Sequence, residues 1–579
     1  MNFEVDIEAD GLEPPVPSSE QTDQLQALVD RYESHRDFYT SPSNNYNEHS
    51  CRDEYLNPFL RILGWDVENE QGVAPQYREV IAENYSSESE RPDYTLTVGG
   101  VPVFFVEAKK PSVNILSNPE PAIQARKYGW NAGHSIAVLT NFENLIIYDT
   151  SVMPDPSDNP QVARYRKYHF SEYVTKLGEI YTLISHESVF GGYYNAYVED
   201  VFETDKSGKE RVDQVFLNQI NEWRLLIANS LIKNSTIFLD AEKLNDAIQD
   251  FINQVVFLRI CEDKNLPTYH KLYELQGEDV HASIIQLLQE ADRRYNSGLF
   301  SQTSAIAQID DSVLKSIIEA LYYPKSPYLF DIIDSSIFGQ IYEMFLSEQI
   351  TIENGHPRLS KKKEYKDRSV VATPAIVARY IADTTLRPLC ENRTVDEIKE
   401  LRIADIACGS GIFLLEAYQF LIDQCLDWMY ENDRDSLIPL TNGQLKLPFK
   451  DKKELLSQCI YGIDIDPYAV EVAKFSLLIK LIEGETSSSI SEAHPVLPDL
   501  DGNIMMGNTL VTPAEARGSG AAANDIEIIA PFDWEDINDG KKFDAIVGNP
   551  PYVKTGDMHA LLPVVEFKVY KNNYQSSYK

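Results

Sequence analysis

Residues 401–417 read LRIADIACGSGIFLLEA, and this stretch decides the fold of the second half of the chain. It opens with a short apolar run ending at Asp405, continues through a turn with Gly409 and Gly411, and closes with an apolar run of helical type. A strand, a glycine turn and a helix start in this order are typical of a nucleotide-binding α/β unit. The glycines let the backbone approach a ligand closely, and Asp405 can accept a hydrogen bond from a ligand ammonium group. The stretch therefore predicts a Rossmann-like domain.

Two downstream segments predict neighbouring strands. Residues 459–464, CIYGID, end in Asp464, and a carboxylate there suits a bidentate contact to two ribose hydroxyls. Asp466 and Pro467 then predict a helix start, with Asp as N-cap and Pro at the first helical position. Residues 503–508, NIMMGN, predict a third strand that would end beside an adenine ring. A phosphate cofactor is the alternative for the Gly-x-Gly turn, but the third glycine of that pattern and a P-loop lysine are both missing.

Residues 549–552 read NPPY and directly follow an apolar run. The side-chain oxygen of Asn549 and the carbonyl of Pro550 can both accept hydrogen bonds from one exocyclic NH2 group, which would aim the nitrogen lone pair at a methyl donor. Pro551 has no N–H and a fixed φ, so the turn is stiff. Tyr552 offers an aromatic face for a base taken out of its stack. A Pro-rich turn after a buried strand is the alternative, since short motifs also arise by chance.

These segments together resemble the motifs of adenine-N6 DNA methyltransferases. Residues 405–411 look like motif I, residues 462–467 like motif II, and residues 548–552 like motif IV. Upstream, residues 371–374, VATP, look like motif X. The order X, I, II, IV is that of the γ class. The chain departs from the family at Asn508, where motif III usually ends in Asp, although the Asn carbonyl oxygen can still accept a hydrogen bond.

The resemblance implies S-adenosylmethionine as cofactor and adenine as the methyl acceptor. Asp405 and Ala407 would contact the methionine moiety. Asp464 would contact the ribose, and Asn508 the adenine amino group. Further cofactor contacts are implied for Thr373, Cys408, Gly409, Gly411 and Ile465. The implied catalytic residues of this domain are Asn549, Pro550, Pro551 and Tyr552.

The N-terminal third predicts a second chemistry at a β-hairpin. Residues 91–110 read RPDYTLTVGGVPVFFVEAKK, with a Gly-Gly turn signal between two strands. Asp93 and Glu107 would lie at the open end of this hairpin, where carboxylates repel unless a divalent cation neutralises them. Mg2+ prefers such oxygen ligands. Lys109, two residues beyond Glu107, would point to the same face and stabilise charge on a scissile phosphate.

The register of this hairpin decides whether the two carboxylates share a face. A strict two-residue loop would place Asp93 opposite Val106 and turn Glu107 to the other face. A three-residue loop, such as a type I turn with a G1 bulge, would pair Asp93 with Glu107. We predict the bulged register, and with it a metal site formed by Asp93 and Glu107.

The hairpin resembles the Pro-Asp…Glu-x-Lys, or PD-(D/E)xK, nuclease superfamily. Gln124 and Tyr128 form the Gln-x-x-x-Tyr pattern of one branch. Residues 52–65 resemble the first helix of such domains, from which Glu54 would join the metal shell. The resemblance implies catalytic roles for Asp93, Glu107, Lys109 and Gln124. The alternative is an exposed hairpin end with solvated lysines, since charged runs usually lie in water.

The order of the segments predicts an α/β protein of several domains. We expect an acidic tail at residues 1–20, a nuclease domain with a mixed sheet at 21–175, a helical connector at 176–360 and an incomplete methyltransferase domain at 361–579. Apolar residues recur at helical spacing through the connector. We expect the rest of the methyltransferase and a target recognition domain to follow, or a separate specificity subunit to supply recognition.

Net charge, cysteine content and apolar runs limit the partners and the location that the chain can have. The formal net charge of −38 argues against a nucleic-acid partner, because phosphate contacts usually need basic surface. Local basic clusters at residues 109–110, 126–127, 361–363 and 450–453 are the candidates for DNA contact. The six cysteines show no paired spacing, and no apolar run reaches the roughly 18 residues of a membrane span. The composition predicts a cytoplasmic protein without a membrane partner.

The combined motifs predict a bifunctional restriction–modification polypeptide, similar to type IIG enzymes, that acts on double-stranded DNA. Its nuclease would use Mg2+, and its methyltransferase would move a methyl group from S-adenosylmethionine to adenine N6. Two alternatives stay open. The NPPY motif also serves methyltransferases of glutamine amides in proteins, and a defence component with an inactive nuclease would only bind.

Overall fold

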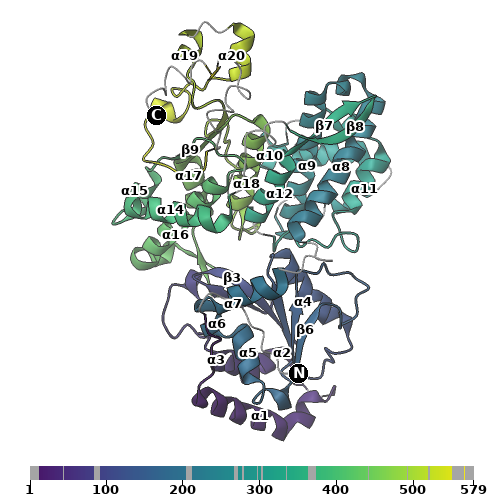
Figure 1. Cartoon of the computed structure of the whole chain (residues 1–579), viewed down its shortest axis with the longest axis vertical. Helices are drawn as coiled ribbons and strands as arrows, with labels where there is room; N and C mark the ends of the chain where they lie inside the picture. The colour runs from purple at the N-terminus through teal and green to yellow at the C-terminus, as the bar shows by residue number, and fades with distance from the viewer. Residues whose placement is uncertain are drawn as a thin grey trace. The chain divides into compact units, whose positions relative to one another are not determined.

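The computed structural model forms two compact units (Figure 1). The first unit comprises Met1–Val212, Tyr323–Ile333 and Pro439–Lys446, and the second comprises Asp213–Tyr322, Asp334–Ile438 and Leu447–Lys579. The structure describes residues 12–43, 45–83, 91–203, 211–266, 271–276, 280–295, 298–300, 304–333, 335–362, 373–440, 442–491, 493, 495–518, 522–550 and 566–567.

The first unit is built on a six-stranded mixed sheet in the order β1-β2-β3-β4-β5-β6. Strands β3 and β4 are parallel, and the other neighbours are antiparallel. Helix α4 (Pro119–Asn131) connects the parallel pair, because parallel neighbours need a crossover. The strands are β1 (Val80–Ala82), β2 (Tyr94–Val98), β3 (Val101–Ala108), β4 (Ile136–Thr140), β5 (Asn144–Asp149) and β6 (Arg164–His169).

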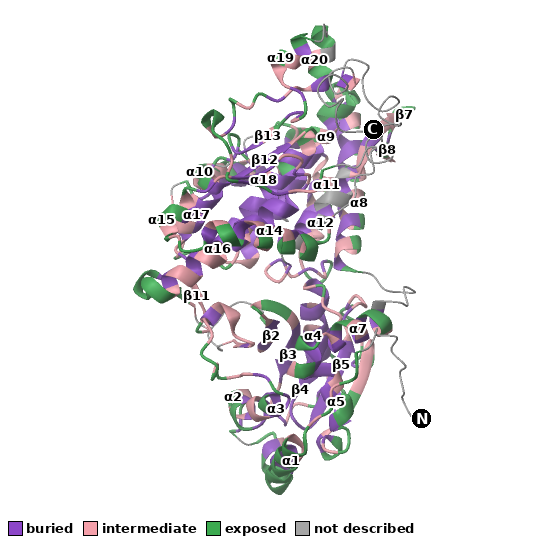
Figure 2. Ribbon diagram, turned by 60° about the vertical axis from the view of Figure 1, so that its left-hand side comes forward, coloured by how far each residue is buried: buried purple, intermediate pink, exposed green. Residues whose placement is uncertain are grey.

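Both faces of this sheet are covered at its centre, as the buried colouring of β4 and β5 shows (Figure 2). Along β4, Ile136 and Val138 join one hydrophobic cluster while Ala137 and Leu139 join another, because side chains alternate along a strand. The smaller cluster includes residues of α4. The larger one draws on α1 (Ser19–Thr40), α3 (Asn57–Ile62), α5 (Leu177–Ile184), α6 (His186–Phe190) and α7 (Tyr193–Val198). Helices α5 to α7 thus share this core although they follow residue 175, and the expected domain boundaries stay a prediction.

The β2–β3 hairpin has the predicted register. Tyr94 pairs with Val106, so the next residues outward, Asp93 and Glu107, lie opposite each other at the open end. The predicted pairing of the two carboxylates is therefore confirmed at the level of the backbone.

The structural feature that sets this register is not the predicted three-residue loop. Val98 pairs with Val101 across a two-residue turn of Gly99 and Gly100, both at positive φ (56° and 82°). The register shifts inside the ladder, where Val103 is the extra residue of β3. The predicted three-residue loop is wrong: a bulge within the strand adds the residue instead.

The helical segment and a hairpin open the second unit. Its helices are α8 (Val212–Asn234), α9 (Ala241–Asp263), α10 (Val280–Tyr295), α11 (Asp311–Glu319) and α12 (Ser335–Leu346). An antiparallel hairpin of β7 (Glu348–Glu353) and β8 (His356–Lys361) follows α12. The expected helical connector therefore also contains a β-hairpin that its apolar spacing did not predict.

A four-stranded parallel sheet forms the rest of the second unit, in the order β13-β12-β9-β14. Its strands are β9 (Ile403–Asp405), β12 (Ile460–Asp464), β13 (Ile504–Met506) and β14 (Ala545–Ile546). Its helices are α14 (Ala375–Cys390), α15 (Val395–Lys399), α16 (Ile412–Asn432), α17 (Phe449–Cys459), α18 (Pro467–Ile482), α19 (Pro513–Gly518) and α20 (Ala523–Ile529). Strand order reverses at β9, and ligands of open α/β sheets bind at the carboxyl ends of the strands there. The predicted α/β fold class is confirmed.

Candidate active sites

Asp93 is fixed at the open end of the β2–β3 hairpin. Its Oδ2 accepts a hydrogen bond from the Ala108 N–H at 2.8 Å, and Arg52 Nη1 lies 3.4 Å from its Oδ1. The Arg52 guanidinium also lies over the Tyr94 ring, 4.5 Å from the ring centroid. Burial raises the pKa of Asp93, while the Ala108 bond and the charges of Lys109 and Arg52 oppose that rise. These contacts hold the carboxyl in one orientation.

Glu107 is a buried carboxyl, only 3% exposed, whose two oxygens differ. Lys109 Nζ donates to Oε1, whereas Oε2 has no hydrogen-bond partner in the described part of the chain. Burial, and then the charge of Asp93, raises the pKa of Glu107 to about 8. An unsatisfied buried carboxylate oxygen is costly. A cation bound between the two acids would supply its partner.

The donor set fits Mg2+, which takes carboxylate oxygens and keeps several of its own waters. Within the described ranges, no group of three or more His, Cys, Asp or Glu side chains forms a complete metal cage. Asp93 and Glu107 would therefore hold the ion together with water.

Sequence reasoning missed a third carboxylate beside these acids. Glu48, at the start of α2 (Glu48–Cys51), places Oε2 3.9 Å from Lys109 Nζ, and its charge contributes to the raised pKa of Glu107. Glu54, expected in this role, is exposed, and Tyr46 Oη donates to its Oε2 at 3.4 Å. No spacing in the sequence signals Glu48, because the fold alone brings α2 to the hairpin end.

Gln124 lies on α4, where its Nε2 donates to Tyr128 Oη at 3.0 Å. The two residues of the Gln-x-x-x-Tyr pattern thus contact each other. The catalytic role of Gln124 stays a prediction.

In the second unit, Asp405 lies at the end of β9 and is 1% exposed. Its Oδ1 accepts a hydrogen bond from the Ala407 N–H at 3.0 Å. Burial, together with the charge of Asp464, raises the pKa of Asp405 to about 7. Gly548, just beyond β14, packs directly on this carboxyl, because a Cβ built there would lie 2.5 Å from Asp405 Oδ1. Only glycine lets the segment after β14 approach so closely.

Asp464 ties the glycine turn to the end of β12. Its Oδ2 accepts from the Gly409 N–H at 2.8 Å, and its Oδ1 accepts from the Asp466 N–H at 2.9 Å. Burial raises the pKa of Asp464. Ile465, the next residue, is 38% exposed, so its apolar side chain is available to a ligand ring. Its predicted contact with the cofactor stays a prediction.

The turn between β9 and α16 depends on its glycines. Gly409 and Gly411 have φ of 53° and 90°, and a Cβ on Gly411 would lie 3.1 Å from the Ala473 Cβ. The Cys408 thiol is buried against Gly462, and burial raises its pKa. Cys408 therefore shapes the turn from the core side, and its predicted cofactor contact stays a prediction.

Asn549 is brought to Thr373 although 176 positions separate them: Asn549 Nδ2 donates to Thr373 Oγ1 at 3.1 Å. The predicted motifs X and IV therefore meet, while Gly548 joins motif IV to motif I. Pro550 is exposed beside Asn549. Pro551 and Tyr552 lie outside the described residues.

Asn508 is buried, and its side chain already has internal partners. Its Nδ2 donates to Glu566 Oε1 at 2.9 Å, and its Oδ1 accepts from the Leu510 N–H at 3.1 Å. Glu566 is buried as well. The predicted contact of Asn508 with an adenine amino group stays a prediction.

The basic clusters are partly paired inside the fold, and their predicted contact with DNA stays a prediction. Each cluster has a member that is paired with an acid inside its own unit. These pairs are Lys109 with Glu107, Arg126 with Asp158, Lys362 with Asp466 and Lys452 with Glu485. Arg126, Lys362 and Lys452 are also buried. Arg126, Lys362 and Lys452 therefore balance internal acids.

Comparisons with known proteins find relatives among restriction enzymes and methyltransferases. Over 567 residues it is 42% identical to the type II restriction enzyme and methyltransferase RM.Eco57I of Escherichia coli, a match that covers 96% of this chain and 55% of that protein. The chain is a homologue of the type II restriction enzyme–methyltransferases. This finding confirms the resemblance to restriction–modification enzymes. The homologue spans about half the length of RM.Eco57I.

Two family matches lie in different parts of the chain, and each includes residues of one candidate site. Residues 458–579 match the Eco57I restriction-modification methylase family, and residues 79–155 match the family of the type I restriction enzyme R protein N terminus. A second relative, the putative type II restriction enzyme and methyltransferase RM.MjaORFECS2P of Methanocaldococcus jannaschii, is 22% identical over 59% of this chain and 34% of its own length.

Solved structures of restriction enzymes are also similar. The type IIG restriction endonuclease BpuSI matches 76% of this chain and 41% of its own, with 15% identity and a TM-score of 0.26. The type IIL restriction-modification enzyme MmeI, in complex with DNA, matches 59% of this chain and 46% of its own, with 15% identity and a TM-score of 0.33. These scores are low, so the similarity to restriction–modification enzymes rests on the sequence relatives. Within the described ranges, no helix combines the length and the apolarity needed to cross a membrane.

Proposed function

We propose that this homologue carries the nuclease and the cofactor-binding part of a DNA restriction–modification enzyme. It would cleave DNA at Asp93, Glu107 and Lys109 with Mg2+, and methylate adenine N6 with S-adenosylmethionine in the second unit. The observation that carries the proposal is the convergence of four distant segments at the carboxyl ends of the strands, where Gly548 packs on Asp405, Asn549 contacts Thr373 and the Gly409 N–H donates to Asp464.

In the methyltransferase site, S-adenosylmethionine supplies the methyl group and the positive charge of its sulfonium. Asp405, when ionised, accepts a hydrogen bond from the ligand ammonium. Asp464 accepts from the ribose hydroxyls, held by the Gly409 and Asp466 N–H groups. The Asn549 side-chain oxygen and the Pro550 carbonyl accept from the target amine and aim its lone pair. No base is needed before attack, because the amine proton can leave after the methyl group arrives.

In the nuclease site, bound Mg2+ would neutralise charge on the scissile phosphate. Asp93 and Glu107 would hold the ion, for which Glu107 Oε2, without a hydrogen-bond partner in the described part of the chain, is available. Lys109 Nζ contacts Glu107 and is positioned to stabilise phosphate charge. Gln124 is proposed to assist from α4. Double-stranded DNA is the proposed partner, and the cytoplasm the proposed location.

The test uses two substitutions, one in each unit, with both activities measured on the full-length protein. Asp93→Ala should abolish cleavage and leave DNA methylation intact. Asn549→Ala should abolish methylation and leave binding of S-adenosylmethionine measurable by calorimetry. Methylome sequencing of cells that express the protein would identify the modified base. If neither substitution changes any DNA activity, the proposed function is wrong and a binding-only role replaces it.

A further inference from the structure

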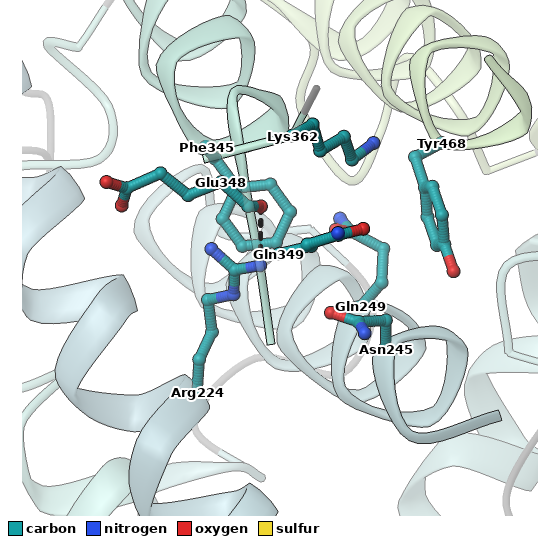
Figure 3. Close-up of a pocket in the computed structure, with 8 residues that line it drawn as sticks. All are labelled: Arg224, Asn245, Gln249, Phe345, Glu348, Gln349, Lys362 and Tyr468. Carbon is teal, nitrogen blue, oxygen red and sulfur yellow. Dashed lines mark hydrogen bonds between the residues drawn. The ribbon is translucent and has the colours of Figure 1, made fainter. Parts of the chain in front are cut away.

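Lys362 is a cation that the mechanism above leaves unused. It directly follows β8 and is 10% exposed, with Nζ 2.7 Å from Asp466 Oδ2. Its ammonium also lies 4.6 Å from the centroid of the Tyr468 ring, toward which it points in Figure 3. The buried ammonium therefore forms an ion pair with the residue that caps the start of α18.

Asp466 connects this ammonium to the acid at the end of β12. The Asp466 N–H donates to Asp464 Oδ1 at 2.9 Å, and Asp464 Oδ2 accepts from the Gly409 N–H at 2.8 Å. Asp466 Oδ1 caps α18 by accepting from the Tyr468 N–H at 2.9 Å. The hydrogen bonds therefore run from Lys362 through both acids to the glycine turn.

The charges along this path also interact. After burial, the charge of Asp466 is a cause of the raised pKa of Asp464. Lys362 neutralises Asp466 directly, so it reduces the repulsion that the Asp464 carboxylate meets. Without the ammonium, the charge of the Asp466 carboxylate, two residues from Asp464, would lose this partner.

The far end of the path is anchored to the helical segment. Lys362 N donates to Ser347 O at 3.0 Å, and Arg224 Nη2 donates to Glu348 O at 2.9 Å, the bond dashed in Figure 3. Asn245 makes two bonds of 2.9 Å to the backbone of Ile350. The β7–β8 hairpin is therefore fixed on α8 and α9, and this anchoring holds Lys362 beside Asp466.

The pair borders a small hollow lined by Arg224, Asn245, Gln249, Phe345, Glu348, Gln349, Lys362 and Tyr468 (Figure 3). Lys362 pairs with Asp466, and Arg224 Nη2 donates to the backbone carbonyl of Glu348. The hollow therefore marks the junction of the hairpin with α18.

We propose that Lys362 is a positioning residue for the cofactor: through Asp466 it orients Asp464 for the two ribose hydroxyls of S-adenosylmethionine. The inference rests on the proposed function, since it assigns Asp464 to the ribose. It also gives the helical segment a role, because the β7–β8 hairpin then helps to set the geometry of the cofactor site.

The test compares binding of S-adenosylhomocysteine with binding of its 2′-deoxy counterpart, by calorimetry on the full-length protein. Lys362→Met keeps the length of the side chain and removes its charge. We expect on the order of tenfold weaker binding of the ribose form, the lower end of the cost of removing a group that orients a ligand-binding side chain. Binding of the 2′-deoxy form should change less, so the preference for ribose falls. Lys362→Arg should restore that preference.

Lys452→Met is the matched control, because Lys452 is also buried and pairs with Glu485 at 2.8 Å away from the cofactor segments. It should lower thermal stability and keep the ribose preference. Asp466→Asn preserves the helix cap, since Asn caps as well as Asp. In that background Lys362→Met should have no further effect on binding, as expected for residues that act through one contact.

The outcomes separate the two proposals. If the wild-type protein binds neither ligand, the proposed function fails. If it binds with a ribose preference that Lys362→Met leaves unchanged, only the inference about Lys362 is overturned. An additive effect of Lys362→Met in the Asp466→Asn background would overturn it as well, even where the single variant folds poorly.

Discussion

Each unit brings two carboxylates together at the ends of neighbouring strands, but their surroundings differ. The hairpin acids, Asp93 and Glu107, each contact a cationic side chain. The loop acids, Asp405 and Asp464, accept hydrogen bonds from backbone N–H groups. Burial raises the pKa in all four cases. The free-energy cost of burying a carboxylate is therefore offset by cationic side chains at the hairpin acids and by backbone N–H groups at the loop acids.

These different surroundings indicate which kind of ligand each pair of acids can bind. Cationic neighbours reduce the repulsion between the hairpin acids and leave Glu107 Oε2 free for a metal ion. Backbone donors orient the loop acids and add no positive charge, so the local field stays negative. Such a field suits a ligand that carries an ammonium, a sulfonium and hydroxyl donors.

The largest effect is expected from Gly548→Ala, which would introduce a steric clash with Asp405, one of the loop acids. In Gly548→Ala the new Cβ would lie 2.5 Å from Asp405 Oδ1, so the carboxyl or the segment that carries Asn549 must move. A displacement of about 1 Å in an active site can cost on the order of 100-fold in rate. We expect methylation to fall by about that factor, with DNA cleavage unchanged.

Gly502→Ala is the control for this substitution, because a Cβ on Gly502 meets no atom within 4 Å. Methylation kinetics of both variants, with cleavage of the same DNA, would measure the contrast. Equal methylation by Gly548→Ala and the wild type would show that the segment after β14 does not pack on Asp405.

A second prediction uses pH to sharpen the comparison. Asp405 has a pKa of about 7, and the cofactor ammonium needs its ionised form. Affinity for S-adenosylmethionine should therefore fall as pH drops below 7, by up to about tenfold per unit. Asp405→Asn should flatten this dependence, and calorimetry between pH 5.5 and 8.5 would measure it. A wild-type profile that is flat below pH 7 would contradict the assignment.

The same group affects stability with a definite sign. The folded pKa of about 7 lies above the ordinary value of 3.8, so the native state holds this proton to higher pH than the unfolded state does. The contribution of Asp405 to stability therefore falls as pH rises from about 4 to 7. In the absence of cofactor, Asp405→Asn should gain stability relative to the wild type over that range, as measured by denaturant unfolding.

The third prediction concerns the metal at the hairpin acids. Because the pKa of Glu107 is raised to about 8, Mg2+ must displace a proton from this carboxyl at neutral pH. Affinity for Mg2+ should rise between pH 6 and 8, less than tenfold per unit. Proton release can be measured by calorimetry in buffers of different ionisation enthalpy. Glu107→Gln should abolish the release, and binding without proton release by the wild type would exclude Glu107 as a ligand.

The sequence predicted the parts of these sites that depend on local pattern. The glycine turn, the acids at the ends of β9 and β12, and the α/β class follow from strand, turn and helix signals within a few residues. The carboxylate pairing of the hairpin was also predicted, but the bulge lies at Val103 because register depends on packing along the whole ladder.

What the sequence could not give depends on contacts between distant segments. Examples are the position of Glu48 beside Lys109 and the ion pair between Lys362 and Asp466. A run of lysines has the same local pattern whether it lies in water or balances buried acids. Only the fold distinguishes the two cases.

The smallest expected effect tests such a distant contact. Glu48→Gln removes a charge that lies 3.9 Å from Lys109 Nζ and helps to raise the pKa of Glu107. Glu107 should then ionise at lower pH, so the pH profile of Mg2+ binding should shift downward while cleavage changes only a few-fold. Glu54→Gln, at an exposed carboxylate, is the matched control and should leave that profile in place. A shift caused by Glu54→Gln and not by Glu48→Gln would restore the role first expected for Glu54, and would mean that α2 does not lie at the hairpin end.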